Sequence, residues 1–188
     1  MIGSNIRIQY AISTDLDTVT DLHAEARATY YRGHIPDAAF EGPEELARSR
    51  AGWAGAIEAG RVLVARTGGT GGSDRTGGSD RAGGSGGSGG SGGEIVGIAA
   101  YGIRDGIMTL SQLHVRPAHW RAGIGTALHT ACTEAWRAAG VTTARLEVYE
   151  HNRRAQSFYA AHGWTPDPDT PRSGAHLVLR LTLAAGTE

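Results

Sequence analysis

The sequence predicts a mixed α/β fold in a single domain. The chain has 188 residues, which is an ordinary length for one domain. Segments with the apolar pattern of strands alternate along it with segments whose apolar residues recur at helical spacing. Two expected strands, 108–115 and 144–150, are joined through a helix, so we expect them to run parallel with a right-handed crossover.

The expected elements follow the order β-α-α-β-β-β-α-β-α-β. Residues 6–12 alternate apolar and polar side chains, which indicates a first strand. Ser13 or Thr14 is expected to cap the next helix, and glycine and proline make residues 30–37 a loop. The later elements are a helix over 43–59, strands over 61–67, 94–101 and 108–115, a helix over 123–139, a strand over 144–150, a helix over 152–162 and a strand over 176–183.

Residues 68–93 are rich in glycine and serine and contain an internal echo, Gly-Gly-Ser-Asp-Arg. Such a segment cannot bury enough apolar surface to fold, so we expect a disordered loop. The strands on either side of it, 61–67 and 94–101, look like the two arms of a hairpin. We therefore place the loop inside one domain that spans 1–188, since closing a longer loop costs only about 1–2 kcal/mol more.

Composition narrows the class of protein. The net charge of −1 does not predict a basic surface that would bind nucleic acid, and no apolar run approaches the length of a membrane span. A single cysteine excludes an internal disulfide and a cysteine-based zinc cluster. The N-terminal residues lack the apolar core of a signal peptide, so a cytoplasmic protein is expected, either a monomer or a homodimer. All 18 basic residues are arginine, which is typical of a GC-rich bacterial genome.

A glycine-rich turn follows the strand over 108–115. The turn ends in Gly123-Ile124-Gly125, where a segment with helical periodicity begins. Free N–H groups at a helix start, with glycines that let a ligand approach, form an anion site that suits a phosphate. The chain has no lysine, which excludes a P-loop, and Leu128 stands where a dinucleotide fingerprint has its third glycine. Close packing of helix on strand is the alternative that needs no ligand.

A second segment extends this pattern. A strand ends at Asn152, and a short helix carrying Phe158 and Tyr159 stops at Gly163. Together the two segments resemble the acetyl-CoA-binding half of the GNAT acetyltransferase superfamily. Trp120 departs from the family pattern, which has Arg or Gln there, and the adjacent Arg121 could supply the missing donor. The matching positions are Leu113, Val115, Pro117, Gly123, Gly125, Asn152, Phe158, Tyr159, Gly163 and Trp164.

The resemblance implies a GNAT-like mixed sheet, flanked by helices, whose two central parallel strands splay apart. It implies acetyl-CoA as co-substrate and no metal ion. The pantetheine arm would enter the gap and pair with the strand edge, and the pyrophosphate would sit on the amides of residues 121–126. The cofactor-binding residues are expected to be Leu113, His114, Val115, Arg121, Ala122, Gly123, Ile124, Gly125, Thr126, Asn152 and Tyr159.

Two residues are candidates for catalysis. The resemblance places Tyr159 near the cofactor sulfur, where its hydroxyl can protonate a leaving thiolate. Glu147 is the candidate base, because the same Leu-Glu-Val spacing occurs in bacterial ribosomal-protein N-terminal acetyltransferases. Glu147 could instead only orient the substrate, and then His114, His34 or Asp37 would serve as base.

The acceptor is expected to be a primary amine of a small molecule or a peptide. By resemblance, its binding wall comprises Tyr30, Tyr31, His34 and Ile35. The expected activity is direct transfer of an acetyl group from acetyl-CoA to this amine in a ternary complex. Two alternatives stay open: a sensor that binds an acyl-CoA without turnover, and a dinucleotide-binding domain, which would need an acidic residue ending a parallel strand.

Overall fold

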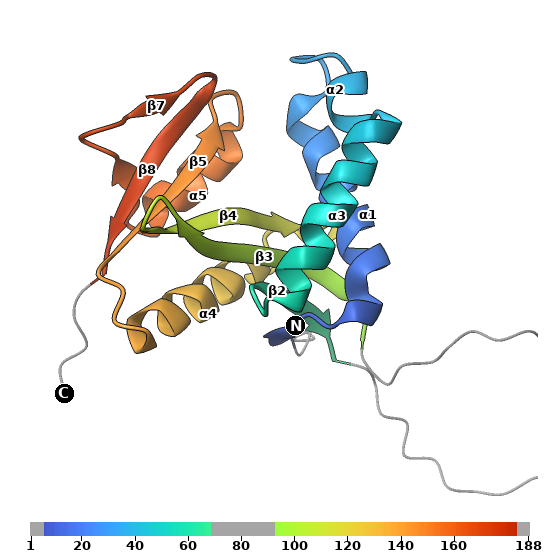
Figure 1. Cartoon of the computed structure of the whole chain (residues 1–188), viewed down its shortest axis with the longest axis horizontal. Coiled ribbons are helices and arrows are strands. Elements are labelled where there is room, and N and C mark those ends of the chain that lie inside the picture. The colour runs from blue at the N-terminus through green and yellow to red at the C-terminus, as the bar shows by residue number, and fades with distance from the viewer. Residues whose placement is uncertain (1–5, 69–92, 184–188) are drawn as a thin grey trace, which may run out of the picture.

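The computed structural model describes residues 6–68 and 93–183, and the core of the glycine- and serine-rich segment lies outside these ranges. The fold is mixed α/β, as predicted, with an eight-stranded sheet flanked by helices (Figure 1). The strands are β1 (Ile6–Tyr10), β2 (Val62–Thr67), β3 (Ile95–Arg104), β4 (Ile107–Val115), β5 (Thr143–Tyr149), β6 (Thr165–Pro166), β7 (Arg172–Ser173) and β8 (His176–Thr182). The helices are α1 (Leu16–Tyr31), α2 (Ala38–Glu41), α3 (Pro43–Glu58), α4 (Ile124–Ala138) and α5 (Arg153–Ala161).

The sheet divides between β4 and β5. Its order is β1-β2-β3-β4-β5-β8-β6, and β7 also pairs with β8. Strands β4 and β5 are parallel, as predicted, but they pair only from Met108 to Leu110 on β4. Beyond Leu110 the two strands diverge, which appears in Figure 1 as the steep tilt of β5 and β8 away from β3 and β4. The predicted splay of the central strands is therefore present.

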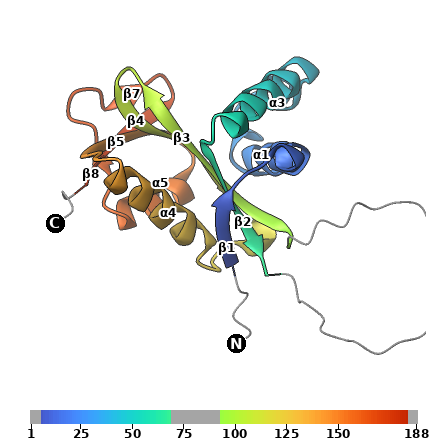
Figure 2. The ribbon, with the colours of Figure 1, turned by 60° about the horizontal axis from the view of Figure 1, so that its bottom comes forward.

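Helices cover both faces of the sheet. Helices α1 and α3 lie on one side, and α4 and α5 on the other (Figure 2). Strand β2 shows the consequence, because Val62 and Val64 pack with the α1–α3 core while Leu63 and Ala65 pack with the α4 core. A strand buried on both faces reads as a continuous apolar run. The strands can hold a site rigidly because both of their faces are packed.

The first helix differs from the prediction at both ends. Its start is preceded by a 3₁₀ turn over Ser13–Asp15, and the carboxylate of Asp15, not the side chain of Ser13 or Thr14, accepts the N–H of Ile12 at 3.0 Å. Its last turn includes Tyr30 and Tyr31, which were predicted to lie in a loop. The ring of Tyr31 packs on Phe40 and Tyr149, and these tertiary contacts extend the helix.

The hairpin arms around the insertion are paired at their base. Strands β2 and β3 run antiparallel, as predicted, and Thr67 N–H donates to Glu94 O at 2.9 Å. Arg66 reinforces this base, because its guanidinium pairs with the buried Asp15 and donates to Gly93 O. The ends of the insertion are thus held together by described residues on both strands.

Candidate active site

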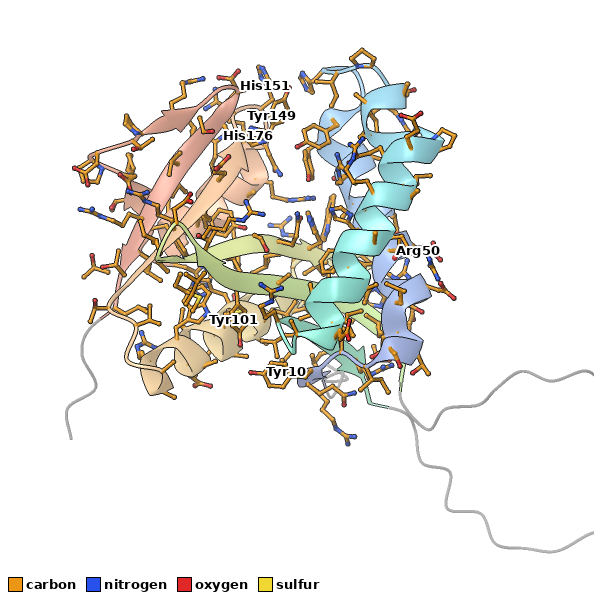
Figure 3. The ribbon with its side chains drawn as sticks, viewed as in Figure 1. Tyr10, Arg50, Tyr101, Tyr149, His151 and His176 are labelled. Atoms are coloured by element: carbon orange, nitrogen blue, oxygen red, sulfur yellow. The ribbon has the colours of Figure 1, made fainter. Side chains whose placement is uncertain are left out.

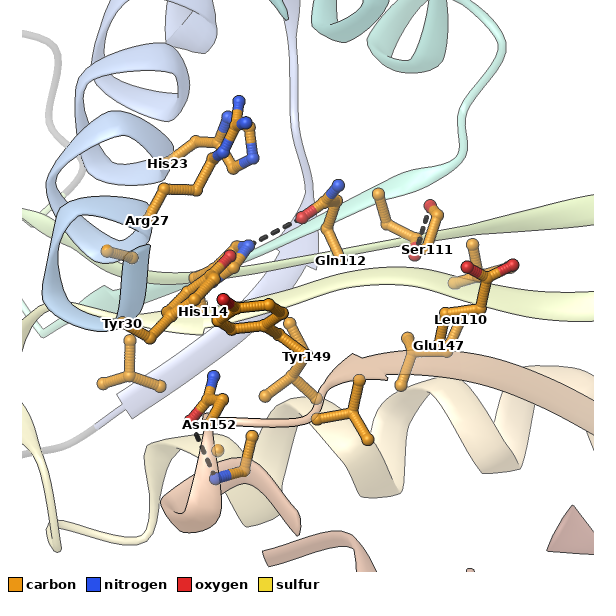
Figure 4. Close-up of a pocket in the computed structure, with 18 of the residues that line it drawn as sticks. His23, Arg27, Tyr30, Leu110, Ser111, Gln112, His114, Glu147, Tyr149 and Asn152 are labelled. Carbon is orange, nitrogen blue, oxygen red and sulfur yellow. Dashed lines mark hydrogen bonds between the residues drawn. The ribbon is translucent and has the colours of Figure 1, made fainter. Parts of the chain in front are cut away.

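A cavity of about 970 Å³ opens where β4 and β5 diverge. Its walls come from α1 and α3 on one side, from β4 and β5 in the middle, and from the starts of α4 and α5 at one end. Figure 4 shows this arrangement, with His23 and Arg27 of α1 on one side and Glu147 of β5 on the other. Such a volume suits a small-molecule ligand.

The turn before α4 presents open backbone amides to one end of the cavity. Arg121 and Gly123 both adopt positive φ, 65° and 78°, and Gly123 is the N-cap residue directly before the helix. A Cβ added at Gly123 would meet no neighbour within 4 Å, so the space beside it is open. Helix N–H groups facing open space form a cradle for an anion. Residues 121 and 123–126 line the cavity, whereas Ala122 does not.

Gly125 has a different reason to be glycine. A Cβ there would lie 3.3 Å from Cε2 of Phe158 on α5. Close packing of two helices is therefore a sufficient reason for the second glycine of the motif, which also lines the cavity. Leu128, one turn further along α4, is fully buried in the core beneath the sheet. A dinucleotide fingerprint needs a glycine there to bring helix and strand together, so this alternative finds no support.

Trp120 fastens the turn to β4. Its indole Nε1–H donates to Val115 O at 2.8 Å. The guanidinium carbon of Arg154, from α5, lies 3.2 Å from the centre of the Trp120 ring, which is a cation–π stack. Arg154 lines the cavity and forms no ion pair in the part of the chain that the structure describes. Sequence reasoning named Arg121 as the neighbouring cation and missed Arg154, because the two segments meet only in the fold.

The open edge of β4 carries backbone groups without a strand partner. Arg116 N–H donates to Val96 O at 2.9 Å. In an antiparallel ladder such bonds fall on alternate residues, so the N–H and C=O groups of Leu113 and Val115 point away from β3. They point toward β5, whose pairing with β4 ends at Leu110. Val115 O is used by Trp120, which leaves both groups of Leu113 and the N–H of Val115 at the edge.

Tyr159 and Asn152 line the cavity from α5 and the turn before it. Tyr159 is 8% exposed, and burial, with a smaller contribution from Cys132, raises the pKa of its hydroxyl above the usual range. The side chain of Asn152 caps α5, as predicted, by accepting the N–H of Ala155 at 3.1 Å. Its amide nitrogen is left on the cavity side (Figure 4).

Glu147 projects from β5 into the cavity (Figure 4). It forms no ion pair or side-chain hydrogen bond with other described residues, and its side chain remains exposed. The other carboxylate of the wall, Glu45, lies 2.7 Å from Arg27 and 2.6 Å from Arg48. Glu147 is thus the cavity-lining carboxylate, among the residues described, whose charge is not already neutralised.

A polar cluster that the sequence did not reveal lies between α1 and β4. His114 Nε2–H donates to Oε1 of Gln112 at 2.7 Å, and the rings of His23 and His114 are 5.2 Å apart. Burial, and after it nearby positive charge, lowers the pKa of His23 to about 4 and of His114 to about 3. Both imidazoles are therefore neutral near pH 7. Ser49 Oγ, from α3, lies 3.0 Å from Nδ1 of His23.

The predicted acceptor wall is only partly in the cavity. Tyr30 and Tyr31 line it, whereas His34 and Ile35 do not. His34 instead stacks on His151, with ring centres 4.6 Å apart and planes 4° from parallel. Figure 3 shows His151 close to Tyr149 and His176, at the end of β5 that faces α1. The stack joins the segment after α1 to the turn after β5, and His34 lies outside the cavity wall.

The comparisons with known proteins agree with this geometry. Residues 79–164 match the model of the acetyltransferase (GNAT) family. These residues carry the signature of a GNAT acetyltransferase domain. This match confirms, over these residues, the resemblance seen in the sequence, and it indicates an acyltransferase enzyme. A comparison with curated proteins finds no match.

Solved structures of several acetyltransferases share the fold of this chain. The PaiA N-acetyltransferase from Thermoplasma acidophilum, in complex with coenzyme A, superposes with a TM-score of 0.74 at 17% identity, covering 95% of this chain and 99% of that one. A GCN5-related N-acetyltransferase from Rhodopseudomonas palustris gives 0.66 at 15% identity, covering 97% and 99%. The ribosomal-protein-S18-alanine N-acetyltransferase from Escherichia coli gives 0.59 at 19% identity, covering 97% of each chain.

Two negative observations apply to residues 6–68 and 93–183. No group of three or more His, Cys, Asp or Glu side chains is placed to hold a metal ion. No helix there has both the length and the apolarity needed to cross a membrane.

Proposed function

We propose that this enzyme transfers an acetyl group from acetyl-CoA to the primary amine of a small molecule, with both substrates bound at once. The observation that carries the proposal is the joint opening of an anion cradle at α4 and an unpaired strand edge on β4 into one cavity. The cradle matches a pyrophosphate, and the edge matches the amides of an extended arm. One cavity that also contains Glu147 and Tyr159 has room for an acceptor.

The residues present fit acetyl-CoA. The amides of residues 123–126 would bind the pyrophosphate, with the guanidinium of Arg154 beside them. Both backbone groups of Leu113 and the N–H of Val115 would pair with the pantetheine amides, because β5 has already left this part of β4. Acetyl-CoA supplies an activated acyl group whose carbonyl carbon is attacked by the amine.

Tyr159 is the proposed acid. Its hydroxyl stays protonated at neutral pH, because burial raises its pKa, and it can give its proton to the thiolate that leaves. The same apolar surroundings raise the proton affinity of a thiol: burial raises the pKa of the neighbouring Cys132 to about 12. The proton affinities of donor and acceptor therefore rise together, and the transfer remains feasible.

Glu147 is the proposed base. Its carboxylate carries an unpaired negative charge on the cavity wall, so it can hold the incoming ammonium group and then take its proton, directly or through water. His114, the reserve candidate, is a poorer base, because burial lowers its pKa to about 3. Two protons leave the nitrogen on the way from ammonium to amide. Glu147 takes one and later releases it to solvent, and the other replaces the proton that Tyr159 gives to the thiolate, so that the amide and the free thiol form.

Transfer of an isotopically labelled acetyl group tests the proposed function. We expect acetyl-CoA carrying a ¹³C-acetyl group to release free thiol only when an amine is added, and the label to appear on that amine by mass spectrometry. Glu147→Gln should move the acidic limb of the rate–pH profile if this carboxylate is the base. A raised KM with an unmoved limb would show instead that Glu147 only positions the amine. Absence of label on every primary amine in a broad panel would overturn the proposed function.

A further inference from the structure

The two carboxylates that line the part of the cavity proposed for the acceptor differ in their partners. Glu147 stands alone on β5, whereas Glu45 is shared between Arg27 and Arg48. The amine of the acceptor is therefore attracted to Glu147, in line with the proposed function on which this inference rests. Other residues of the cavity must then bind the end of the acceptor that is far from its amine.

Two further arginines line the cavity away from the α4 cradle. Arg61 follows α3, and Arg104 ends β3 at the tip of the hairpin. Neither forms an ion pair with any residue in the described ranges. The side chain of Arg61 lies across the backbone of Gly102, since its Nη1 is 3.2 Å from the place that a Cβ on Gly102 would occupy. Both cations are accessible to a ligand and lack an internal counter-ion.

The strand register places these arginines and Glu147 on one face. Gly102 pairs with Thr109 of β4, and Thr109 pairs with Arg145 of β5. Side chains of residues directly opposite one another share a face, and so do residues two apart on one strand. Arg61 over Gly102 and Glu147 therefore share a face, two strand spacings apart across the sheet and two residues apart along it, or roughly 12 Å. One small molecule can bridge a gap of this size.

The wall on the α1 side is also unfavourable to a second cation. Arg27 is largely buried there, and its charge contributes to the lowered pKa of both His23 and His114, after burial itself. These histidines stay neutral and offer hydrogen bonds, not negative charge. A cleft with low-dielectric walls concentrates the field of its charges. Apart from Glu147, this cleft therefore favours anionic or neutral groups.

We propose that the acceptor is a small amine carrying an anionic group, a carboxylate or a phosphate, several bonds from its nitrogen. The amine lies at Glu147, and the anion is bound by Arg61 with help from Arg104. Guanidinium groups bind both anions through paired hydrogen bonds. Diamines and polyamines are poor acceptors in this arrangement, because their second cation would face the two arginines.

Acceptors of equal length test this directly. We expect kcat/KM for 6-aminohexanoate and 6-aminohexyl phosphate to exceed that for hexylamine by about tenfold, the scale of one charge-assisted hydrogen bond. The value for 1,6-diaminohexane should be lower than that for hexylamine. Added salt should reduce the differences, because the groups involved are accessible to solvent. The ratio of the two anionic acceptors shows whether carboxylate or phosphate is preferred.

Substitutions of the two arginines test whether they cause the preference for anionic acceptors. Arg61→Gln should abolish the advantage of 6-aminohexanoate over hexylamine, and Arg61→Glu should reverse it in favour of 1,6-diaminohexane. Arg104→Gln provides a second, independent variant, and Arg137→Gln on the exposed side of α4 is the matched control. The KM for acetyl-CoA should not change in any of them.

The inference is overturned if hexylamine or the diamine equals the anionic acceptors, if Arg61→Gln and Arg104→Gln both keep the preference, or if other amines are acetylated but none of these four is. Failure of the proposed function would look different, because acetyl-CoA would then not be consumed with any amine.

Discussion

At the residue scale, the chemistry depends on a few side chains whose surroundings differ from those of similar residues elsewhere. Tyr159 is buried in the cavity wall, while Tyr10, on β1, is half exposed and hydrogen-bonded to Tyr101. Arg154 stacks on Trp120 inside the cavity, while the adjacent Arg153 lies outside it. These pairs give each prediction a control of the same residue type.

Tyr159→Phe should lower kcat by roughly 10²–10⁴-fold, because the ring still packs but the proton donor is gone. Binding of acetyl-CoA, followed by calorimetry, should stay nearly constant. Tyr10→Phe should leave kcat unchanged, since Tyr10 lies outside the cavity. Full activity of Tyr159→Phe at every pH would show that the proton comes from solvent or from another residue.

Arg154→Ala should weaken binding of acetyl-CoA, because a guanidinium beside the α4 cradle loses its interaction with a phosphate. The loss should be about tenfold, as for one charge-assisted hydrogen bond. Binding of acetyl-pantetheine, which has no phosphate, should not change. Arg153→Ala is the matched control. Equal losses for both ligands would mean that Arg154 acts through the fold of α5 and not on a phosphate.

At the scale of elements, the sequence predicted those whose signal is local and long. The helices over residues 43–58 and 124–138 and the strands around the splay were found within a few residues of their predicted ends. Elements of two to four residues, such as α2, β6 and β7, were missed, because they are too short to show a period. The extra turn of α1 was missed because tertiary contacts of Tyr31 stabilise it.

The same distinction applies to the site. Motif residues such as Gly123, Asn152 and Tyr159 line the cavity, and sequence could single them out because each belongs to a local strand–turn–helix pattern. His23 and Arg61 were missed because no motif contains them and only the fold brings them to β4. The packing of Gly125 on Phe158 was missed, because Phe158 comes from a segment 33 residues further on.

Gly125→Val should destabilise the protein by roughly 1–3 kcal/mol, the usual cost of overpacking, because its side chain must displace Phe158. Urea unfolding measures the change. Gly55→Val is the control, since a Cβ at Gly55 of α3 meets nothing within 4 Å, and its effect should be within about 0.5 kcal/mol. Similar losses in both variants would refute the packing role of Gly125.

Deleting residues 70–91 should leave the melting temperature and kcat nearly unchanged. The paired base of the hairpin, Thr67 with Glu94, lies outside the deletion and is reinforced by Arg66. Loop residues that supply few contacts can be removed at little cost. A large loss of either quantity would show that this segment packs on the enzyme or takes part in recognition.

At the scale of the whole molecule, three histidines with lowered pKa values, two of them buried and His114 half-buried, make the fold sensitive to acid. Burial is the main cause of the lowered pKa of each, to about 4 for His23 and His129 and about 3 for His114. His129 also accepts Trp164 Nε1–H at 2.9 Å. In the unfolded chain these side chains bind protons below about pH 6.5. The contribution of these histidines to the free energy of unfolding is therefore fully present above about pH 6.5, and it is lost as the pH falls toward 4.

The slope of unfolding free energy against pH should reach about 1.4 kcal/mol per pH unit for each histidine in this window. Urea unfolding at pH 7.5, 6 and 5 measures it. His129→Gln should reduce the slope by the contribution of one histidine, since glutamine can still accept the Trp164 N–H but does not titrate. An unchanged slope in this variant would show that His129 binds its proton equally well in both states.

Direct titration of the protein with acetyl-CoA tests the central claim, that the gap between β4 and β5 is an acetyl-CoA site. We predict one site per chain by calorimetry, with competition from free CoA and no binding of NAD under the same conditions. Arg154→Ala should weaken the binding and Arg153→Ala should not. Absence of acetyl-CoA binding to the folded protein, or equal binding of NAD, would contradict the account.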